Sequence, residues 1–455
     1  SASTTTGDVS YSGTVNAGDS VSAETESGSI SYTGEVSAQN GSVTTTAVEG
    51  DISFEGSVDA GTDVSASTSV GEISYSGVVN ADDSVSASTT TGEINYNGTV
   101  NAGDSVSTAT ESGSISYTGE VNAEDGSVTT TAKDGDISFE GSVDAGTNVS
   151  ASTSTGDVSY SGVVSAGDSV SAATESGSIS YTGEVNAEDG SVTTTAEEGN
   201  ISFEGTVDAG TNVSASTSTG DVSYSGTVSA GNSVRASTNA GDISYAGEVN
   251  AQDGSVTTTA EDGDISFEGK VDAGTNVSAS TNTGDVSYSG TVNAGDSVRA
   301  STNTGDISYA GEVNAQEGSV TTTAGEGDIS FEGTVDAGTN VSASTNTGDV
   351  SYIGTVNAGD SVSASTNEGD ISYTGEVNAQ EGSVTTNAVE GNISFEGIVD
   401  AGTNVSASTN TGDVSYSGTV NAGDSVSAST NAGDINYAGE VTAEDGSVTT
   451  TAGEG

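Results

Sequence analysis

The chain has 455 residues and a formal net charge of −63, with four Lys and Arg against 67 Asp and Glu, and it lacks Pro, Cys, Met, Trp and His. This composition excludes disulfide bonds, zinc sites built from Cys or His, and nucleophilic triads that depend on a His base. It also leaves no basic surface for nucleic acid, and no apolar run approaches the roughly 18 residues of a membrane span.

One short unit recurs along the whole chain. Its first three copies, called types A, B and C, are Ser1–Val21, Ser22–Val43 and Thr44–Val64. Fourteen units of 21 residues and seven of 22 are followed by a partial unit, residues 449–455. The order ABC gives a 64-residue super-repeat, broken once where a second A unit, Ser86–Val106, follows the A unit Ser65–Val85. Because no residue is left for a linker, we expect residues 1–455 to form a single continuous domain, and the incomplete last unit indicates a segment of a longer protein.

Taken in chain order, the A unit predicts three short strands, over Val9–Tyr11, Val15–Ala17 and Val21–Thr25. Apolar residues alternate with polar ones in each segment, which is the two-residue period of a strand. Gly residues separate the segments, and Gly permits the tight bends of corners. The extra residue of B units falls in the corner after Ala38, where an insertion does not change the facing of a strand. No segment carries helical periodicity of useful length.

A single unit has too little apolar surface to fold alone, whereas stacked units share one continuous core. If every unit forms one coil, Val9 lies beneath Ile30, Ile30 lies beneath Ile52, and strand N–H and C=O groups pair between coils. The sequence therefore predicts an all-β, right-handed, three-sided parallel β-solenoid with 21–22 residues per coil and about 21 coils. At ~4.8 Å per coil, the solenoid would be about 100 Å long.

All 15 Tyr and 6 Phe occupy one position of the unit, with Phe in C units and Tyr in A and B units. We expect their rings to point inward and to form one stacked aromatic ladder. Its first members are Tyr11, Tyr32, Phe54, Tyr75, Tyr96, Tyr117 and Phe139. C units carry Thr45 and Ala47 where A units carry Ala66 and Thr68, and these two exchanges offset each other in volume within one packed layer.

Carboxylates are the only abundant ionisable groups. One position of the unit holds the weak metal candidates Asp8, Asp51, Asp136, Asp157 and Asp221. A solvent-facing Asp column would attract a hard cation such as Ca²⁺, although Ser and Asn at the same position of other units dilute the like charge, and the glycine-rich nonapeptide of calcium-binding β-rolls is absent. Cleavage of a polysaccharide would need a non-repeating pair of carboxylates, whereas these acids repeat. We therefore expect no enzyme and no required cofactor.

Two sparser features complete the inventory. Five N-x-[ST] sequons are spaced by 64 residues beside an inward Val, and their Asn residues are candidate glycosylation sites: Asn148, Asn212, Asn276, Asn340 and Asn404. The four cations are Lys133, Lys270, Arg235 and Arg299. We expect the two Arg side chains to pair with nearby acids and to have no further role, because surface ion pairs contribute little stability.

The charge has consequences for the environment of the chain. A charge of −63 over about 100 Å approaches the linear density of duplex DNA, roughly one charge per 1.7 Å. Such a column repels itself unless salt or divalent cations screen it. The acid excess with few Lys is also the halophilic pattern, and we expect order to be lost when salt or divalent ions are removed.

The repeated phrase, of which residues 284–308, GDVSYSGTVNAGDSVRASTNTGDIS, are one copy, resembles the repeats of β-solenoid surface adhesins such as filamentous-haemagglutinin-like proteins. The resemblance implies the structural shaft of an extracellular or cell-surface adhesin or fibre, with the chain itself or other surface and matrix components as partners. Two alternatives remain: a solenoid that binds polysaccharide, Ca²⁺ or ice, and a polysaccharide-acting enzyme. Ice binding would need a flat, regular Thr array on an outer face, whereas the Thr residues read as irregular or inward.

Overall fold

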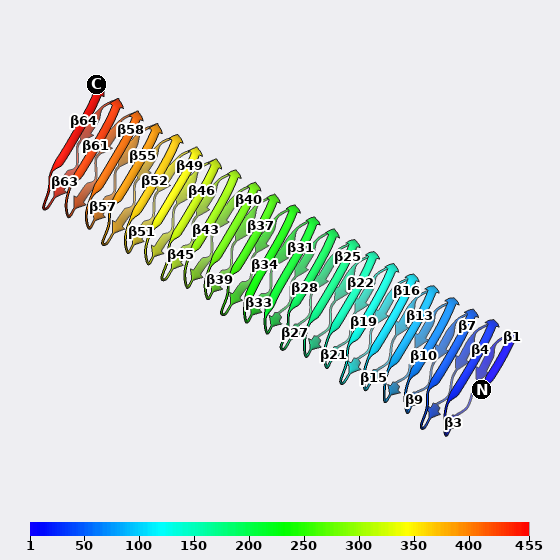
Figure 1. Ribbon diagram of the computed structural model, residues 1–455. Coiled ribbons are helices and arrows are strands. Elements are labelled where there is room, and N and C mark those ends of the chain that lie inside the picture. Colours follow the sequence, from blue (N-terminus) through cyan, green and yellow to red (C-terminus); the bar gives the residue numbers. More distant parts are fainter. Residues whose placement is uncertain (455) are drawn as a thin grey trace. The chain divides into compact units, whose positions relative to one another are not determined.

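The computed structural model describes residues 1–454, which form 64 β-strands and, within that range, no helix. The chain divides into two compact units, Ser1–Ala230 and Gly231–Gly455. In both, the backbone winds through the same coil of two short strands and one long strand (Figure 1). The fold is an all-β, three-sheet parallel solenoid of about 21 coils, as the sequence predicts.

The long strands make up the first sheet. In the first unit they are β1 Ala2–Thr6, β4 Val21–Ser27, β7 Val43–Glu49, β10 Val64–Val70, β13 Val85–Thr91, β16 Val106–Ser112, β19 Val128–Asp134, β22 Val149–Thr155, β25 Val170–Ser176, β28 Val192–Glu198 and β31 Asn212–Thr219. In the second unit they are β34 Ser233–Ala240, β37 Val256–Asp262, β40 Val277–Thr283, β43 Val298–Thr304, β46 Val320–Glu326, β49 Val341–Thr347, β52 Val362–Glu368, β55 Val384–Glu390, β58 Val405–Thr411, β61 Val426–Ala432 and β64 Val448–Glu454.

The short strands make up the other two sheets. Every strand of the second sheet has three residues and ends at the aromatic residue of its coil, from β2 Val9–Tyr11 to β62 Ile435–Tyr437. Every strand of the third sheet ends at an Ala, from β3 Val15–Ala17 to β63 Glu440–Ala443, with three residues up to β30 and four from β33 Thr227–Ala230 onward.

Within each unit the strands pair in parallel, each with its equivalent in the next coil. Val9 pairs with Ile30 and Ile30 with Ile52, which is the predicted register. The third strand of the coil is longer than the apolar pattern indicates, since β4 continues to Ser27, which pairs with Thr6. Its last two residues both face solvent, so the strand is held there by backbone pairing and leaves no apolar signal in the sequence.

One Gly in each coil has a backbone conformation that other residues avoid. The φ of Gly71 is +150°, and a Cβ on this residue would lie 2.2 Å from the carbonyl oxygen of Gly50 in the previous coil. That carbonyl oxygen accepts a hydrogen bond of 3.0 Å from the buried hydroxyl of Thr68. Steric crowding by the stacked backbone therefore requires Gly at this corner, and the inward Thr completes its hydrogen bonding.

The interior of each unit is filled by the inward residues of all three sheets. Val and Ile at strand starts, the aromatic rings, and Ala at strand ends are almost fully buried. The described residues include no helix long and apolar enough to cross a membrane.

Candidate functional site

The aromatic residues form an inward ladder in each unit. Eleven rings stack in the first unit, from Tyr11 to Tyr224, and ten in the second, from Tyr245 to Tyr437. Neighbouring rings within a unit have centroids 4.8–4.9 Å apart and planes within 6° of parallel. The rings of Tyr32, Tyr75 and Tyr117 are 0 % exposed, which removes them from any surface that a ligand reaches.

The phenol hydroxyls distinguish the coil types. In most B coils the Tyr hydroxyl bonds to the inward Thr of the following C coil, and the oxygen–oxygen distances are 3.2 Å for Tyr181 and Thr194, 2.9 Å for Tyr309 and Thr322, and 2.9 Å for Tyr373 and Thr386. The first B coil is an exception, because the hydroxyls of Tyr32 and Thr45 have no hydrogen-bond partner. The coil that follows the A coil of Tyr75, Tyr160 or Tyr288 carries Ala in place of this Thr, and these three buried hydroxyls have no hydrogen-bond partner. Tyr352, also in an A coil, instead donates to the carbonyl oxygen of Ser363 at 3.4 Å. The exchange of Ala and Thr in C units thus supplies a hydrogen bond as well as volume, which sequence reasoning missed.

Burial also changes the acidity of the phenols. It raises the pKa of Tyr32 and of Tyr117 to about 12, and for Tyr117 this rise outweighs the lowering by its hydrogen bonds with Thr108 and Thr130. Burial likewise raises the pKa of Tyr75 and Tyr160 above the ordinary value. All these phenols are therefore neutral at physiological pH, because a phenolate inside the solenoid would be desolvated.

The predicted metal candidates lie on the outer corner before the second sheet and bond to the backbone. The Oδ1 atoms of Asp8, Asp51, Asp136 and Asp157 accept the N–H of the equivalent residue in the next coil, at 2.7–2.9 Å. The N–H of Asp221 is itself donated to Oδ1 of Asn200, at 2.8 Å. This position thus requires a side chain that accepts a hydrogen bond from the N–H of the next corner, and Ser and Asn can also do so.

The charge along this column differs between the units. Ser and Asn interrupt it in the first unit, as the dilution of like charge requires. In the second unit only Asn392 interrupts it, after seven consecutive coils with Asp: Asp242, Asp264, Asp285, Asp306, Asp328, Asp349 and Asp370. Over residues 1–454, no group of three or more Asp and Glu is placed to hold a metal ion. Binding of Ca²⁺ to the column stays a prediction.

The sequon Asn residues are half-buried at the corner before the long strand. Oδ1 of Asn276, Asn340 and Asn404 accepts the N–H of a Ser in the next coil, at 3.2–3.3 Å. Asn148 and Asn212 hold the same position in the first unit and are half-buried too. The amides of Asn276, Asn340 and Asn404 thus cap the corner, and glycosylation of any of the five Asn residues stays a prediction.

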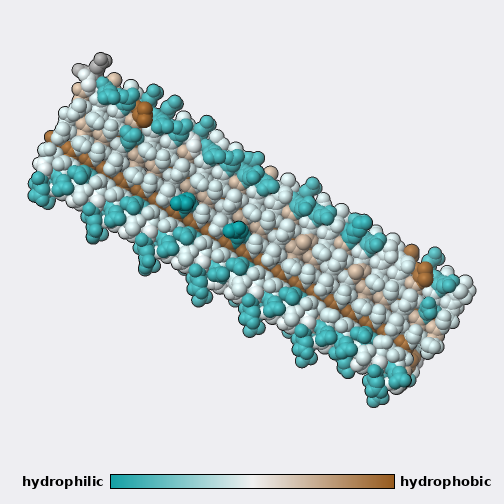
Figure 2. All heavy atoms as spheres, viewed as in Figure 1, coloured by the Kyte–Doolittle hydropathy of each residue, from teal (hydrophilic) through white to brown (hydrophobic). Residues whose placement is uncertain are grey.

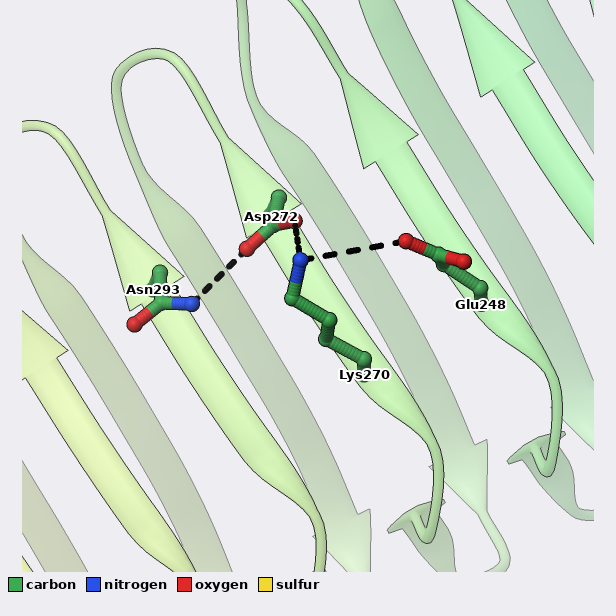
Figure 3. A network of polar contacts seen from close by, with 4 residues as sticks. All are labelled: Glu248, Lys270, Asp272 and Asn293. Carbon is green, nitrogen blue, oxygen red and sulfur yellow. Dashed lines mark hydrogen bonds and ion pairs between the residues drawn. The ribbon is translucent and has the colours of Figure 1, made fainter.

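The cations behave in two ways. Lys270 contacts Asp272 in its own strand and lies 3.8 Å from Glu248 in the previous coil, while Asn293 donates to Asp272 at 2.8 Å (Figure 3). The hydrogen bond and charge of Asp272 raise the pKa of Lys270. Neither Arg235 nor Arg299 has an ion pair within the described part of the chain, so the expected pairing with nearby acids is not found.

A shallow groove follows the outer side of the third sheet and the corner beyond it. We call it the amide groove, because its lining repeats an Asn or Asp from the middle of each strand. In the first unit it encloses about 570 Å³ and is lined by Asn80, Asn101, Asn122, Asp144, Asp82 and Glu124 together with Ala and Gly. Its side chains bond along the stack, with Asn80 donating to Asp59 at 2.6 Å and Asn101 to Asn80 at 2.8 Å.

The same groove recurs in the second unit. There it encloses about 450 Å³ around Asn250, Asp272 and Asn293, and about 430 Å³ around Asp336, Asn357 and Asn378. Sequence reasoning missed this groove, although the sequence contains a signal for it. In the short strands of the third sheet, the residue between Val and Ala is Asn in most A and B units and Asp in C units.

Comparison with known proteins gives one similarity. Residues 144–294 match the family model Toastrack DUF4097. No curated protein and no solved structure matches the chain significantly.

Proposed function

We propose that the chain is a structural shaft segment of an extracellular or cell-surface adhesin or fibre. The observation that carries this proposal is repetition: the aromatic ladder, the Asp column and the amide groove recur with the same residue types from coil to coil. A catalytic site would combine residues that occur once. We therefore also propose that the chain is not an enzyme and requires no cofactor.

The bonding pattern supports a mechanical role. Backbone hydrogen bonds link each coil to the next, as from Val9 N to Ser29 O at 2.9 Å and from Ile30 N to Asp51 O at 2.8 Å. These bonds lie along the direction of stacking, in which a shaft transmits load. Because each coil contacts only its neighbours, duplication of a unit lengthens the stack without a new core.

The location of the chain tests this proposal. Antibodies raised against the purified chain and coupled to gold should label thin projections outside the source cells in electron micrographs, with pre-immune serum as the control. Label confined to the cell interior would reject the extracellular shaft. Label on the surface without any elongated projection would retain the location and reject the fibre.

The amide groove favours one second candidate function, the binding of a linear, uncharged polysaccharide. Its Asn side chains present donors and acceptors at the spacing of the coils, and its Ala and Gly floor leaves room for a sugar ring. Glycan arrays with the whole chain would test this, with Asn101→Ala and Asn357→Ala combined as the groove variant. If no neutral glycan binds, or if the variant binds equally well, this second function is rejected.

A further inference from the structure

Three neighbouring columns on the outward side of the first sheet in the second unit are nearly free of charge. Ahead of the last residue of each long strand, three residues point outward there, such as Ser342, Ser344 and Asn346 of β49. The last residue also faces solvent, and this flanking column includes the acids Asp262, Glu326, Glu368 and Glu390. We call the three outward positions ahead of it in β34–β64 the hydroxyl face. Its first two columns are Ser or Thr except at Arg235, Arg299 and Asn387, and its third column is mostly Asn.

The contrast with the remainder of the unit is large. Residues 231–455 contain 33 Asp and Glu, of which only Glu261 stands on the hydroxyl face. Its charge is offset by Arg235 and Arg299, so the face carries a net charge of +1. In the view of Figure 2, the long strands lie in front, and the hydrophilic side chains gather along the edges of the sheet. The face is thus a surface on which two such acidic molecules approach without strong repulsion.

The side chains of this face are already ordered. Ser363 donates to Ser342 at 3.1 Å, Ser365 to Ser344 at 3.0 Å, and Asn367 to Asn346 at 2.5 Å. The same three ladders recur between β58 and β61, where Asn431 donates to Asn410 at 2.6 Å. Because these rotamers are fixed before association, little side-chain entropy is lost when the face is covered.

The size of the face is sufficient for a stable contact. Ten steps of ~4.8 Å along the sheet and a width of ~17 Å give roughly 800 Å² per copy, which is the area of a standard protein interface. A shallow hollow of about 470 Å³ interrupts the first column around Thr257, Ser278 and Arg299. Elsewhere a second face of the same kind can lie on this one at the usual sheet separation of ~10 Å.

We propose that the hydroxyl face of the second unit pairs with the same face of a second copy of the chain. The partner is a like copy because the surface is self-complementary, with hydroxyls and amides that both donate and accept. The equivalent face of the first unit is less suitable, since it carries Glu24, Glu26, Glu111, Glu175 and Glu197. This inference does not rest on the proposed function and holds wherever the chain acts.

The mass of the full chain in solution, measured by sedimentation velocity over a range of concentrations and salt, tests the proposal. We expect a dimer whose dissociation constant falls as salt rises, because salt screens the acids that flank the two faces. The variant Ser301→Glu with Ser365→Glu should weaken dimerisation at least tenfold. It should still fold, because Glu24 stands in the same column of β4, and an unchanged melting curve would verify this.

Two matched controls isolate the face. Thr291→Glu with Thr355→Glu adds the same charge to the third sheet, where Glu312 and Glu376 pair with these positions. Ser67→Glu with Ser152→Glu adds it to the first sheet of the first unit. Both controls should dimerise like the native chain. A native chain that is monomeric at every salt and concentration, or controls that dissociate as readily as the face variant, would overturn the proposal.

Discussion

The two kinds of buried Tyr should respond in opposite directions to the same substitution. Replacing Tyr75, Tyr160 and Tyr288 by Phe removes buried hydroxyls that have no hydrogen-bond partner. Phe already occupies the same ladder in C coils at the same 4.8–4.9 Å spacing, so no change in packing is expected. An unpaired buried hydroxyl costs about 1–3 kcal/mol, and its removal should stabilise the fold by about 1 kcal/mol per site.

The matched variant replaces Tyr181, Tyr309 and Tyr373 by Phe. Each of these phenols bonds to a Thr at 2.9–3.2 Å, and the substitution leaves that Thr hydroxyl buried without the phenol. The expected loss is about 1–2 kcal/mol per site. Both triple variants delete three buried hydroxyls from the aromatic ladders of the two units, so they differ in hydrogen bonding.

Urea denaturation followed by circular dichroism compares the two variants with the native chain. The midpoint should rise for the first variant and fall for the second. Midpoints that move in the same direction for both would refute the assignment of hydrogen bonds to the two coil types, because packing and hydrophobicity change equally in the two triples.

Three further perturbations follow from the same structure. Burial raises the pKa of Tyr32 and Tyr117 to about 12 from an ordinary value of 10. The free energy of unfolding should therefore keep its full value below pH 10 and fall between about pH 10 and 12, by at most ~1.4 kcal/mol per pH unit for each Tyr. Tyrosinate absorbance should rise together with loss of the circular dichroism signal of the strands, and ionisation of these two residues without unfolding would contradict this. Gly71→Ala should lower stability by about 2–3 kcal/mol, because a Cβ would lie 2.2 Å from the backbone of Gly50. The melting temperature should fall accordingly, and an unchanged melting temperature would show that the corner relaxes. Asp306→Ala should lower the free energy of unfolding by about 1 kcal/mol, because Oδ1 of Asp306 accepts the N–H of Asp328 in the next coil at 2.8 Å. Asp306→Asn keeps an acceptor and should be neutral. Equal losses of stability for the two variants in urea unfolding would exclude the capping role.

Much of the fold could be predicted because the chain repeats. The alternation of Val9 with Tyr11 specifies an inward face, and recurrence of that pattern every 21 or 22 residues specifies parallel stacking. The extension of β4 to Ser27 could not be predicted, since the last residues of that strand are outward and polar. Backbone pairing between coils holds them in the strand, and no side-chain pattern reports it.

The contacts of the candidate site were harder to predict from the sequence, because they also depend on how neighbouring coils stack. The bond between Tyr373 and Thr386 joins residues 13 apart across the interior, so it depends on how far the ring reaches inward. The position of Asp306 indicated only an exposed acid, because its bond to a backbone N–H of the next coil needs the corner geometry. The neutrality of the hydroxyl face emerges only when the outward columns of many strands are viewed side by side.

X-ray diffraction from flow-aligned chains tests the central claim, that equivalent coils stack in parallel register along the chain. We predict a strong reflection at about 4.8 Å along the alignment axis, equal to the ring spacing of 4.8–4.9 Å within the ladders, without a reflection at twice that spacing. A 4.8 Å reflection perpendicular to the axis, or a repeat near 9.6 Å from antiparallel strands, would contradict the solenoid and every inference drawn from it.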